Sequence, residues 1–569
     1  MNLLNRFDQV WLVDFEFHQP DGSRPEPICM VAKEYFSGRT ITAGPTELSN
    51  MERAPFDTGP LSLFVAYYTP AELSCFKVLG WNMPEHVCDL YTEFRCQTNG
   101  MRVPCGTGLL GALAYIGAPA VGEADKSAMR SIAIRGGPYT TNELTALMSY
   151  CAEDVGALVP LLEALASLLS PHSLLRGRYT KAVAHMEATG IPIDIGTLDR
   201  LQSSWANIKD ALVDSLAGDT GIFNGVSFSQ EGFVRYLERR NIPWPVLESG
   251  RPDLKDSTFK TMASAYPDLL PIRELRNALS QLRLTNITVG SDGRNRCMLS
   301  PFQSRTGRNQ PSNAKFIFGP ATYLRSLIKP APGMALAYID YSQQEFGIAA
   351  ALSGDTAMME AYSSGDPYLA FAKQAGAVPP DATKQSHGRE RDIFKTTVLG
   401  VQYAMGAETL AARIGACPFE GHRLLALHRR IYPAFWKWSD QFVSAAMLSG
   451  RAQTRLCWQI KVGSDTNPRS LRNFPMQANG AEILRLACCY ATESGISVCA
   501  PVHDALLIEA PCNEIDDAVS QTINLMRRAS EDVLGGFPLA SEAKIIAHPD
   551  RYMDPRGREM WETLMSLIQ

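Results

Sequence analysis

The alternation of apolar and polar residues predicts short strands and longer helices along the chain. Residues 11–17 (WLVDFEF) form a strand pattern, in which alternate side chains share a face. Asp14 and Glu16 should therefore lie side by side, while Val13, Phe15 and Phe17 face a core on the other side of the strand. Residues 144–159 have helical periodicity, and we expect Pro160 to end or kink that helix.

Two later segments place carboxylates at the ends of strands. The apolar run 334–340 ends at Asp340 and is followed by the start of a helix. Residues 496–508 indicate two short strands around a tight turn, with His503 and Asp504 at its tip. A buried strand that ends in Asp is common, so neither segment alone indicates catalysis.

A helix between these two segments carries basic residues on one side. The residues that fall within about one side, at 100° per residue, are Arg391, Lys395, Leu399 and Gln402. Such a face is usually solvated. Its position between two strands that end in carboxylates favours a functional role instead.

The composition is that of a globular protein with several cores. The chain has 569 residues and a mass of 62.5 kDa, with 45% hydrophobic and 20% charged residues. Its apolar runs are far shorter than the roughly 20 residues of a membrane span, and the N-terminus has no signal pattern. The 13 cysteines lack zinc-ligand spacing. We therefore expect a cytoplasmic protein with reduced thiols and no membrane partner.

The net charge of −5 conceals an asymmetry along the chain. Residues 1–170 contain 11 Lys and Arg against 19 Asp and Glu, whereas residues 271–330 contain 10 against 2. The second segment includes Arg305, Arg308 and Arg325, a concentration of arginine that favours phosphate contacts. We therefore expect the acidic segment 1–170 and the basic segment 271–330 to interact differently with a polyanion such as a nucleic acid.

The N-terminal carboxylates suggest a metal site. Two adjacent carboxylates repel each other unless a cation lies between them, so Asp14 and Glu16 suggest a hard divalent ion. In the following helix, Tyr150 and Asp154 are four residues apart and share a face. A strand DxE followed by a helical YxxxD resembles the DEDD family of 3′→5′ exonucleases. The resemblance implies that Asp14, Glu16 and Asp154 hold two Mg²⁺ ions at a single-stranded DNA 3′ end, with Tyr150 orienting the attacking water.

One part of this region departs from the exonuclease family. The expected fourth ligand is an Asp in a middle motif, and the best match here is Glu72, with Asp89 as the alternative. Glu72 would replace the Asp with a longer reach. The departure leaves open that the exonuclease is silent.

The order of three downstream motifs is more informative than any one of them. DYSxxE at 340–345, RxxxKxxxxGxxY at 391–403 and HD at 503–504 resemble motifs A, B and C of the family A DNA polymerases, the DNA polymerase I group. Further collinear matches lie at 306–308, 324–330, 431–433 and 469–477, and Phe223–Leu284 resembles the thumb. The resemblance covers essentially the whole chain, so we expect no 5′-nuclease domain.

The two resemblances imply a multidomain fold of α/β and α+β type. An RNase H-like exonuclease domain is expected at 1–175, followed at 176–569 by a right-hand polymerase domain with an antiparallel palm sheet and helical fingers and thumb. The expected polymerase boundaries are 190–300 for the thumb, 301–354 and 446–569 for the palm, and 355–445 for the fingers.

The polymerase resemblance assigns a role to each motif. Asp340 and Asp504, helped by the Tyr341 backbone carbonyl, would hold two Mg²⁺ ions, with Mn²⁺ as an alternative metal. Arg391 and Lys395 would bind the incoming triphosphate. Further nucleotide contacts are implied for Gln343, Glu345, Leu399 and Tyr403, and Glu345 would block a ribose 2′-hydroxyl. Primer–template contacts are implied for Arg308, Arg469, Asn473, Gln477 and His503.

Several positions depart from the polymerase pattern. Ala505 stands where the family usually has Glu, which leaves two strong carboxylates rather than three. Leu399 occupies the Phe or Tyr position that packs against the incoming nucleotide, and Ala404 replaces a Gly. The change at Leu399 puts nucleotide selectivity in doubt.

Other readings compete with a proofreading DNA polymerase. A single-subunit RNA polymerase shares the A–B–C layout, but the fused exonuclease and Glu345 favour DNA. A non-catalytic accessory subunit would have lost the aspartates that this chain keeps. The short loops suggest a bacteriophage enzyme, monomeric and active in the host cytoplasm, with primer–template DNA and dNTPs as partners.

Overall fold

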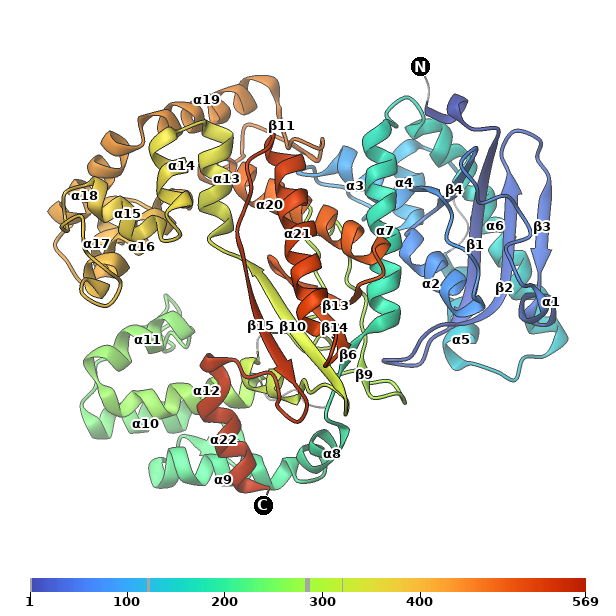
Figure 1. Cartoon of the computed structure of the whole chain (residues 1–569). Helices are drawn as coiled ribbons and strands as arrows, with labels where there is room; N and C mark the ends of the chain where they lie inside the picture. The colour runs from blue at the N-terminus through green and yellow to red at the C-terminus, as the bar shows by residue number, and fades with distance from the viewer. Residues whose placement is uncertain (1–2, 120–122, 282–286, 320, 569) are drawn as a thin grey trace. The chain divides into compact units, whose positions relative to one another are not determined.

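The computed structural model describes residues 3–119, 123–281, 287–319 and 321–568 (Figure 1). It divides into two compact units. The first comprises Met1–Gly190, Met298–Gln310 and Leu336–Ile545, and the second comprises Ile191–Cys297, Pro311–Ala335 and Ile546–Gln569. Leu284, the predicted end of the thumb-like segment, lies outside the described residues.

The N-terminal part of the first unit, Met1–Gly190, is called the N-terminal region below. It is built on a five-stranded sheet in the order β3-β2-β1-β4-β5. Its strands are β1 (Gln9–His18), β2 (Glu26–Glu34), β3 (Thr40–Ala43), β4 (Ser62–Ala66) and β5 (His86–Asp89). The β1–β2 and β2–β3 pairs are antiparallel, whereas β1–β4 and β4–β5 are parallel. The predicted strand is confirmed, because Val13 and Phe15 of β1 are buried in a core on one face of the sheet.

Seven helices accompany this sheet in the described part of the N-terminal region. They are α1 (Pro45–Asn50), α2 (Thr69–Leu79), α3 (Leu90–Thr98), α4 (Leu109–Ile116), α5 (Glu123–Arg135), α6 (Thr141–Leu165) and α7 (Pro171–Thr189). Helix α6 contributes to the core with Val10 and Leu12 of β1, and α2 contributes to the core of the opposite face. Helix α7 packs directly on β5, since a Cβ on Gly177 would lie 1.8 Å from the Val87 carbonyl oxygen.

Helix α6 does not end at Pro160. It continues to Leu165, because Leu158, Leu161 and Leu162 are buried in the sheet core and hold the last turns despite the missing proline N–H. By length and composition α6 could cross a membrane, but its apolar stripe is part of this core, as in the core helix of a soluble domain.

A second sheet, in the order β13-β14-β10-β15, lies at the centre of the C-terminal part of the chain. Its strands are β10 (Met334–Tyr341), β13 (Ser497–Val502), β14 (Ala505–Pro511) and β15 (Ser541–Ala547). Helix α20 (Pro468–Glu493) packs against α21 (Ile515–Leu534), α7 and β13. Helix α13 (Gln344–Ser353) begins just after β10, as the apolar run ending at Asp340 predicts.

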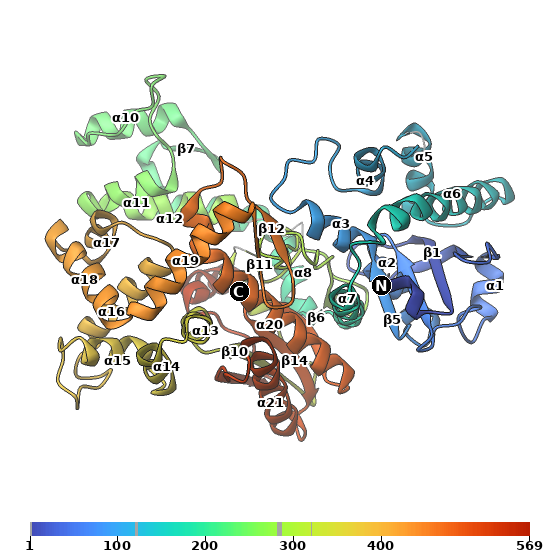
Figure 2. The same cartoon turned by 90° about the horizontal axis from the view of Figure 1, so that it is seen from above.

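A helical region follows α13 in the first unit. It contains α14 (Thr356–Ser363), α15 (Pro367–Gln374), α16 (Gly388–Gln402), α17 (Ala407–Ile414), α18 (Pro418–Ile431) and α19 (Pro433–Ser449), and the hairpin β11 (Arg451–Gln453) and β12 (Gln459–Lys461) comes next. Figure 2 shows α16, α17 and α18 grouped together, and these helices contact one another. The aromatic rings of Phe371, Phe394 and Tyr432, together with His428, form the contacts between α15, α16 and α18.

The second unit is mainly helical. Its helices are α8 (Ile195–Ser203), α9 (Trp205–Ala217), α10 (Gln230–Arg240), α11 (Asp256–Ala265), α12 (Leu270–Gln281) and α22 (Arg558–Leu567). Its two-stranded pairs are β6 (Ile191–Pro192) with β9 (Arg294–Asn295), and β7 (Phe223–Asn224) with β8 (Ser227–Phe228). Phe233 and Phe259 stack in one core, where Trp244 packs edge-on against both rings. An Arg325–Asp554 ion pair of 2.8 Å is also buried in this unit.

Candidate active sites

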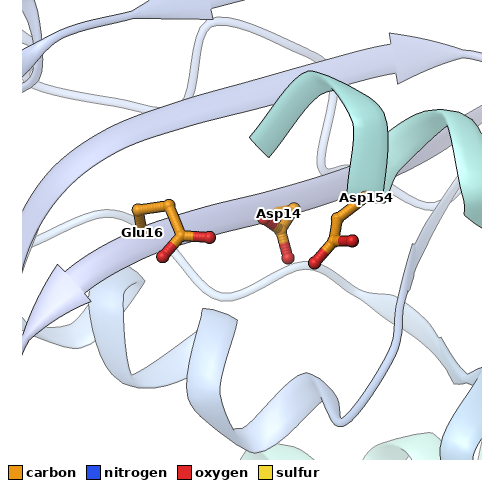
Figure 3. A group of neighbouring side chains, drawn as sticks. All are labelled: Asp14, Glu16 and Asp154. Carbon is orange, nitrogen blue, oxygen red and sulfur yellow. The ribbon is translucent and has the colours of Figure 1, made fainter. Parts of the chain in front are cut away.

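Three carboxylates meet where β1 passes α6. Asp14 and Glu16 extend from one face of β1, and Asp154 reaches the same space from α6 (Figure 3). One oxygen from each lies within 4.8 Å of the others. Within the part of the chain that the structure describes, this is the one such group of three or more His, Cys, Asp or Glu residues. The spacing suits oxygen ligands of a hard divalent cation.

The electrostatics of this cluster are unfavourable without a cation. Burial, followed by the charges of Glu16 and Asp154, raises the pKa of Asp14 well above its usual value. The buried Oδ2 of Asp14 has no hydrogen-bond partner among the described residues. A buried carboxylate oxygen of this kind fits a metal ligand, because a cation would supply the missing partner.

Tyr150 lies one helical turn before Asp154 on α6. Its hydroxyl hydrogen-bonds to the Asp154 side chain, and burial together with that neighbouring charge raises the pKa of Tyr150. The phenol is therefore neutral and acts as a donor beside the cluster. The predicted pairing of these two residues on one helix face matches their positions in α6.

The structure distinguishes between the two candidates for the fourth carboxylate. Glu72, on α2, is 4% exposed, and burial followed by the charge of Asp14 raises its pKa. Its Oε2 accepts a 2.8 Å hydrogen bond from the Phe15 backbone N–H, which places it against β1. Asp89 instead caps α3, with its oxygens accepting from three backbone N–H groups and from the Thr92 hydroxyl. Glu72 is therefore the better candidate.

A second pair of carboxylates lies at the ends of neighbouring strands. Asp340 is near the end of β10, and Asp504 is in the turn between β13 and β14, beside β10. Their side chains are within hydrogen-bonding distance, and burial followed by the charge of Asp504 raises the pKa of Asp340 to about 7. The turn is tight because His503 has a left-handed φ of 58°.

This second site also has features that suit a cation. The buried Oδ1 of Asp340 lacks a hydrogen-bond partner in the described structure. The Tyr341 N–H donates to the Asp504 backbone carbonyl at 3.4 Å, which ties the two strand ends together. Ala505 is buried and adds no charge.

Glu542 is a carboxylate near this pair that the sequence analysis missed. It is exposed on β15, the neighbour of β10, and its charge also raises the pKa of Asp340. No local pattern marks it, since an acidic residue at the start of an edge strand is usually only a solvated side chain. Strand pairing alone brings it to Asp340.

Lys395 and Leu399 are on an accessible side of α16, with Leu399 36% exposed, whereas the Arg391 side chain, one turn before Lys395, is only 12% exposed. Arg391 Nε donates to Asp366 Oδ2 at 2.5 Å. The ring of Tyr368 lies 5.4 Å from the Arg391 guanidinium carbon and 5.9 Å from Lys395 Nζ. The sequence around these two neighbours shows only a helix start, the Asp366-Pro367 pair, and gives no sign of their contacts with α16.

Gln402 does not share the accessible side of α16. It is 2% exposed, so the predicted polar face is shorter than the periodicity suggests. The cause is packing, because the last turn of α16 is covered where the chain turns toward α17.

Four predicted contact residues from distant segments converge near the start of α13. The Tyr403 hydroxyl donates to Glu345 Oε1 at 3.4 Å, and Gln477 Nε2 donates to the Tyr403 hydroxyl at 3.3 Å. Arg308 Nη2 lies 3.8 Å from the same Glu345 oxygen. Burial raises the pKa of Glu345, while Arg308 opposes that rise.

The other predicted contacts are more dispersed. Arg469, Asn473 and Gln477 lie at four-residue spacing along α20, with Arg469 exposed and Asn473 buried. Gln343 precedes α13 in a left-handed conformation with φ of 45°, and His503 is exposed at its turn. Gln343 and His503 thus lie within three residues of Asp340 and Asp504 along the chain, whereas Arg469, Asn473 and Gln477 lie on α20.

Comparisons with known proteins point in one direction. Residues 275–545 match the family model described as DNA polymerase family A. The chain is 27% identical over 395 residues to the thermostable DNA polymerase I of Thermus thermophilus, covering 63% of this chain and 45% of the relative. It is 22% identical over 400 residues to the DNA polymerase of Mycobacterium phage D29, covering 68% of this chain and 64% of the relative. The chain spans about half the length of the bacterial relatives it matches.

A solved structure has a similar fold. It is titled as the POL domain of Pol1 from M. smegmatis in complex with DNA primer-template and dNTP. The TM-score is 0.72 at 18% identity, covering 94% of this chain and 95% of that one. At this identity the likeness establishes the fold.

Proposed function

This chain belongs to DNA polymerase family A, with residues 275–545 as the matching region, and we propose that it adds deoxynucleotides to a primer 3′ end on a DNA template. The observation that carries the proposal is the contact between Asp340 and Asp504, which come from separate strands and have side chains within hydrogen-bonding distance. Two carboxylates in contact are the ligands that a two-metal phosphoryl-transfer site requires.

Asp340, Asp504 and the Tyr341 backbone carbonyl would hold the divalent ions, and Mg²⁺ is the expected metal. When bound, the ions would neutralise charge on the attacking and leaving oxygens. The protein's own part is to hold both carboxylates side by side at the end of the sheet. The hydrogen bond between Tyr341 and Asp504 supports this by joining the strand ends.

Arg391 and Lys395 would bind the triphosphate of the incoming nucleotide. Lys395 is exposed on α16, the Arg391 side chain one turn earlier is 12% exposed, and the Tyr368 ring lies beside both cations. Asp366 Oδ2 accepts from Arg391 Nε, and Asp392 Oδ1 lies 3.5 Å from Nη1, so the donation to phosphate oxygens would come mainly from Nη2.

Glu345, Tyr403 and Gln477 would form the side of the site that meets the sugar and base. Glu345 is held by Tyr403 and Arg308, so its carboxylate is positioned to exclude a 2′-hydroxyl and to favour deoxynucleotides. Leu399 lies on α16 at the position where the family usually has Phe or Tyr. It would contact the nucleotide with a smaller aliphatic side chain instead of an aromatic ring.

We further propose that the N-terminal region is a 3′→5′ exonuclease acting on a single-stranded DNA end. The sheet order β3-β2-β1-β4-β5, with its mixed strand directions, supports an RNase H-like domain. Asp14, Glu16, Glu72 and Asp154 would hold two divalent ions, and the neutral Tyr150 hydroxyl would orient the attacking water.

A DNA polymerase with a silent exonuclease is the second candidate. It is favoured by Glu72, because this residue stands where the exonuclease family has Asp and is not one of the three carboxylates whose oxygens lie within 4.8 Å of one another.

One assay tests both proposals. A 5′-labelled primer–template is incubated with the protein in four reactions: Mg²⁺ alone, Mg²⁺ with dNTPs, Mg²⁺ with rNTPs, and Mg²⁺ with dNTPs and an excess of EDTA. We expect extension with dNTPs only, shortening with Mg²⁺ alone, and no change with EDTA. Extension without shortening would support the silent exonuclease, and no extension under any condition would contradict the polymerase proposal.

A further inference from the structure

The loop Met298–Gln310 carries Arg305 and Arg308 and belongs to the same compact unit as the N-terminal region. We propose that Asn99, on the N-terminal side of the molecule, is a positioning residue for this loop and thereby for primer–template binding. The proposal rests on the proposed polymerase function. It assigns to the N-terminal region a second task beside trimming, namely to hold a DNA-contacting loop of the polymerase.

Asn99 is placed to bind two backbone segments at once. It follows the last residue of α3 and is 1% exposed. Its Nδ2 donates to the Arg305 carbonyl at 2.7 Å and to the Gln459 carbonyl at 2.8 Å. The backbone carbonyl of Asn99 accepts from the Lys461 N–H at 2.8 Å. One side chain thus joins the loop to the β11–β12 hairpin.

The backbone after Asn99 also requires close approach to the hairpin. Gly100 has a φ of 87°, and a Cβ there would lie 2.5 Å from the Lys461 carbonyl oxygen. Only glycine avoids both the conformational strain and that clash. The end of α3 is therefore shaped to fit the hairpin that flanks the loop.

Two residues of α3 bind Gln303 in the first half of the loop. The Tyr91 hydroxyl donates to the Gln303 side chain, and Arg95 Nη2 donates to the Gln303 carbonyl at 2.7 Å. From α7, the Tyr179 hydroxyl accepts from Asn309 Nδ2 at 2.7 Å. The N-terminal region thus contacts the loop at its beginning, middle and end.

The loop needs these contacts because its backbone is strained. Ser300 and Phe302 have left-handed φ values of 49° and 59°, which non-glycine residues seldom adopt and which persist only when surrounding contacts fix them. The C-terminal part of the first unit supplies the remaining support, through Trp458 Nε1 to the Arg305 carbonyl at 3.0 Å and Arg485 Nη1 to the Gly307 carbonyl at 2.7 Å.

Loss of the Asn99 amide would remove one of the two donors to the Arg305 carbonyl, which would keep Trp458 Nε1, and would also remove a donor to the Gln459 carbonyl. A carbonyl that is held by fewer donors is fixed less firmly. Movement of the Arg305 carbonyl would shift the loop that sets Arg308 beside Glu345, where the two side chains are 3.8 Å apart. The result would be weaker binding of primer–template DNA with the phosphoryl-transfer residues untouched.

The test compares Asn99→Ala with Glu493→Gln. Glu493 pairs with Arg178 at 2.5 Å and also joins the N-terminal region to α20, but it does not touch the loop. Three quantities are measured: amide hydrogen exchange of peptides covering 298–310, primer–template affinity by anisotropy without dNTPs, and trimming of single-stranded DNA. We expect Asn99→Ala to speed exchange in the loop and to weaken primer–template binding about tenfold, with trimming unchanged. Glu493→Gln should leave loop exchange and binding unchanged.

A second variant tests the proposal if Asn99→Ala does not fold. Tyr91→Phe combined with Arg95→Ala removes two loop contacts with little change in volume at Tyr91, and it should produce the same effects at smaller size. Unchanged loop exchange, or faster exchange with unchanged primer–template affinity, overturns the proposal. The exchange measurement does not depend on catalysis, and extension by the unmodified chain reports on the proposed function separately.

Discussion

The two carboxylate sites of this protein are built in different ways. The N-terminal site gathers Asp14, Glu16 and Asp154 beside β1, and burial, followed by the charges of Glu16 and Asp154, raises the pKa of Asp14. The site at Asp340 has two closely paired carboxylates at strand ends, with separate cations on α16. A site that only hydrolyses a phosphodiester needs metal ligands and a water. A site that also binds a triphosphate needs fixed positive charge, and that charge comes from a different helix.

The largest effect should come from removing a ligand at the strand ends. Asp340→Ala and Asp504→Ala should each reduce primer extension on the order of 10³-fold, because the remaining carboxylate cannot hold two cations. Extension is measured by single-turnover kinetics, with primer–template affinity as the control that should stay within about twofold. Substantial extension by both variants would refute the metal assignment.

The same change in the N-terminal site should affect only trimming. Asp14→Ala combined with Glu16→Ala should reduce degradation of a labelled single strand on the order of 10²-fold or more while extension continues. Degradation at the parental rate would show that this cluster is not a nuclease site. A parallel loss of extension would break the separation between the two sites.

Glu72 tests how much the buried charge costs without metal. Its pKa is higher in the folded chain than in the unfolded one, so its contribution to stability is complete below the unfolded pKa and is lost as pH rises through the folded pKa. In EDTA at pH 8, Glu72→Gln should therefore raise the free energy of unfolding by about 1–2 kcal/mol, since Gln keeps the Phe15 bond without the charge.

Denaturant titrations at several pH values measure this difference between Glu72→Gln and the unmodified chain. The gap should narrow toward pH 4 and also on addition of Mg²⁺. A gap that does not change with pH would mean that the charge of Glu72 is not responsible. The same variant should trim single strands about tenfold more slowly if Glu72 is a ligand.

The smallest effect is expected at Glu542. Because this carboxylate is exposed and adds to the negative potential at Asp340 from outside the pair, Glu542→Gln should weaken Mg²⁺ activation of extension only about twofold to threefold. Titration of extension rate against Mg²⁺ measures the shift. Glu559→Gln, an exposed change on α22, is the control. A loss as large as that of Asp340→Ala would make Glu542 a third ligand.

Local patterns predicted the elements that carry the sites. The strand at Asp14, the strand ending near Asp340, the hairpin around Asp504 and the helix with Arg391 all follow from apolar periodicity, and the structure has each of them. Pro160 was the exception, because a local rule about proline gave way to packing of the following leucines.

Contacts between distant segments could not be predicted in this way. Glu72 was separable from Asp89 only when the hydrogen bonds of both were known, since each is an acidic residue near a helix start. Glu542 and Asp366 approach their partners through strand pairing and helix packing, and nothing in their immediate sequence indicates it. The resemblance to known motifs supplied the roles, and tertiary structure supplied these neighbours.

Helix α20 runs for 26 residues from Pro468 to Glu493, about 39 Å at 1.5 Å per residue, and contains Pro475, which lacks the N–H of a regular helical turn. Its first turns carry Asn473 and Gln477, which are expected to touch the primer–template, and its last residue is paired with Arg178 of α7. Most of the turns between these two ends are buried, and the helix packs against α21 and α7. A single helix therefore connects the residues that are expected to meet the DNA with the contact to the N-terminal region.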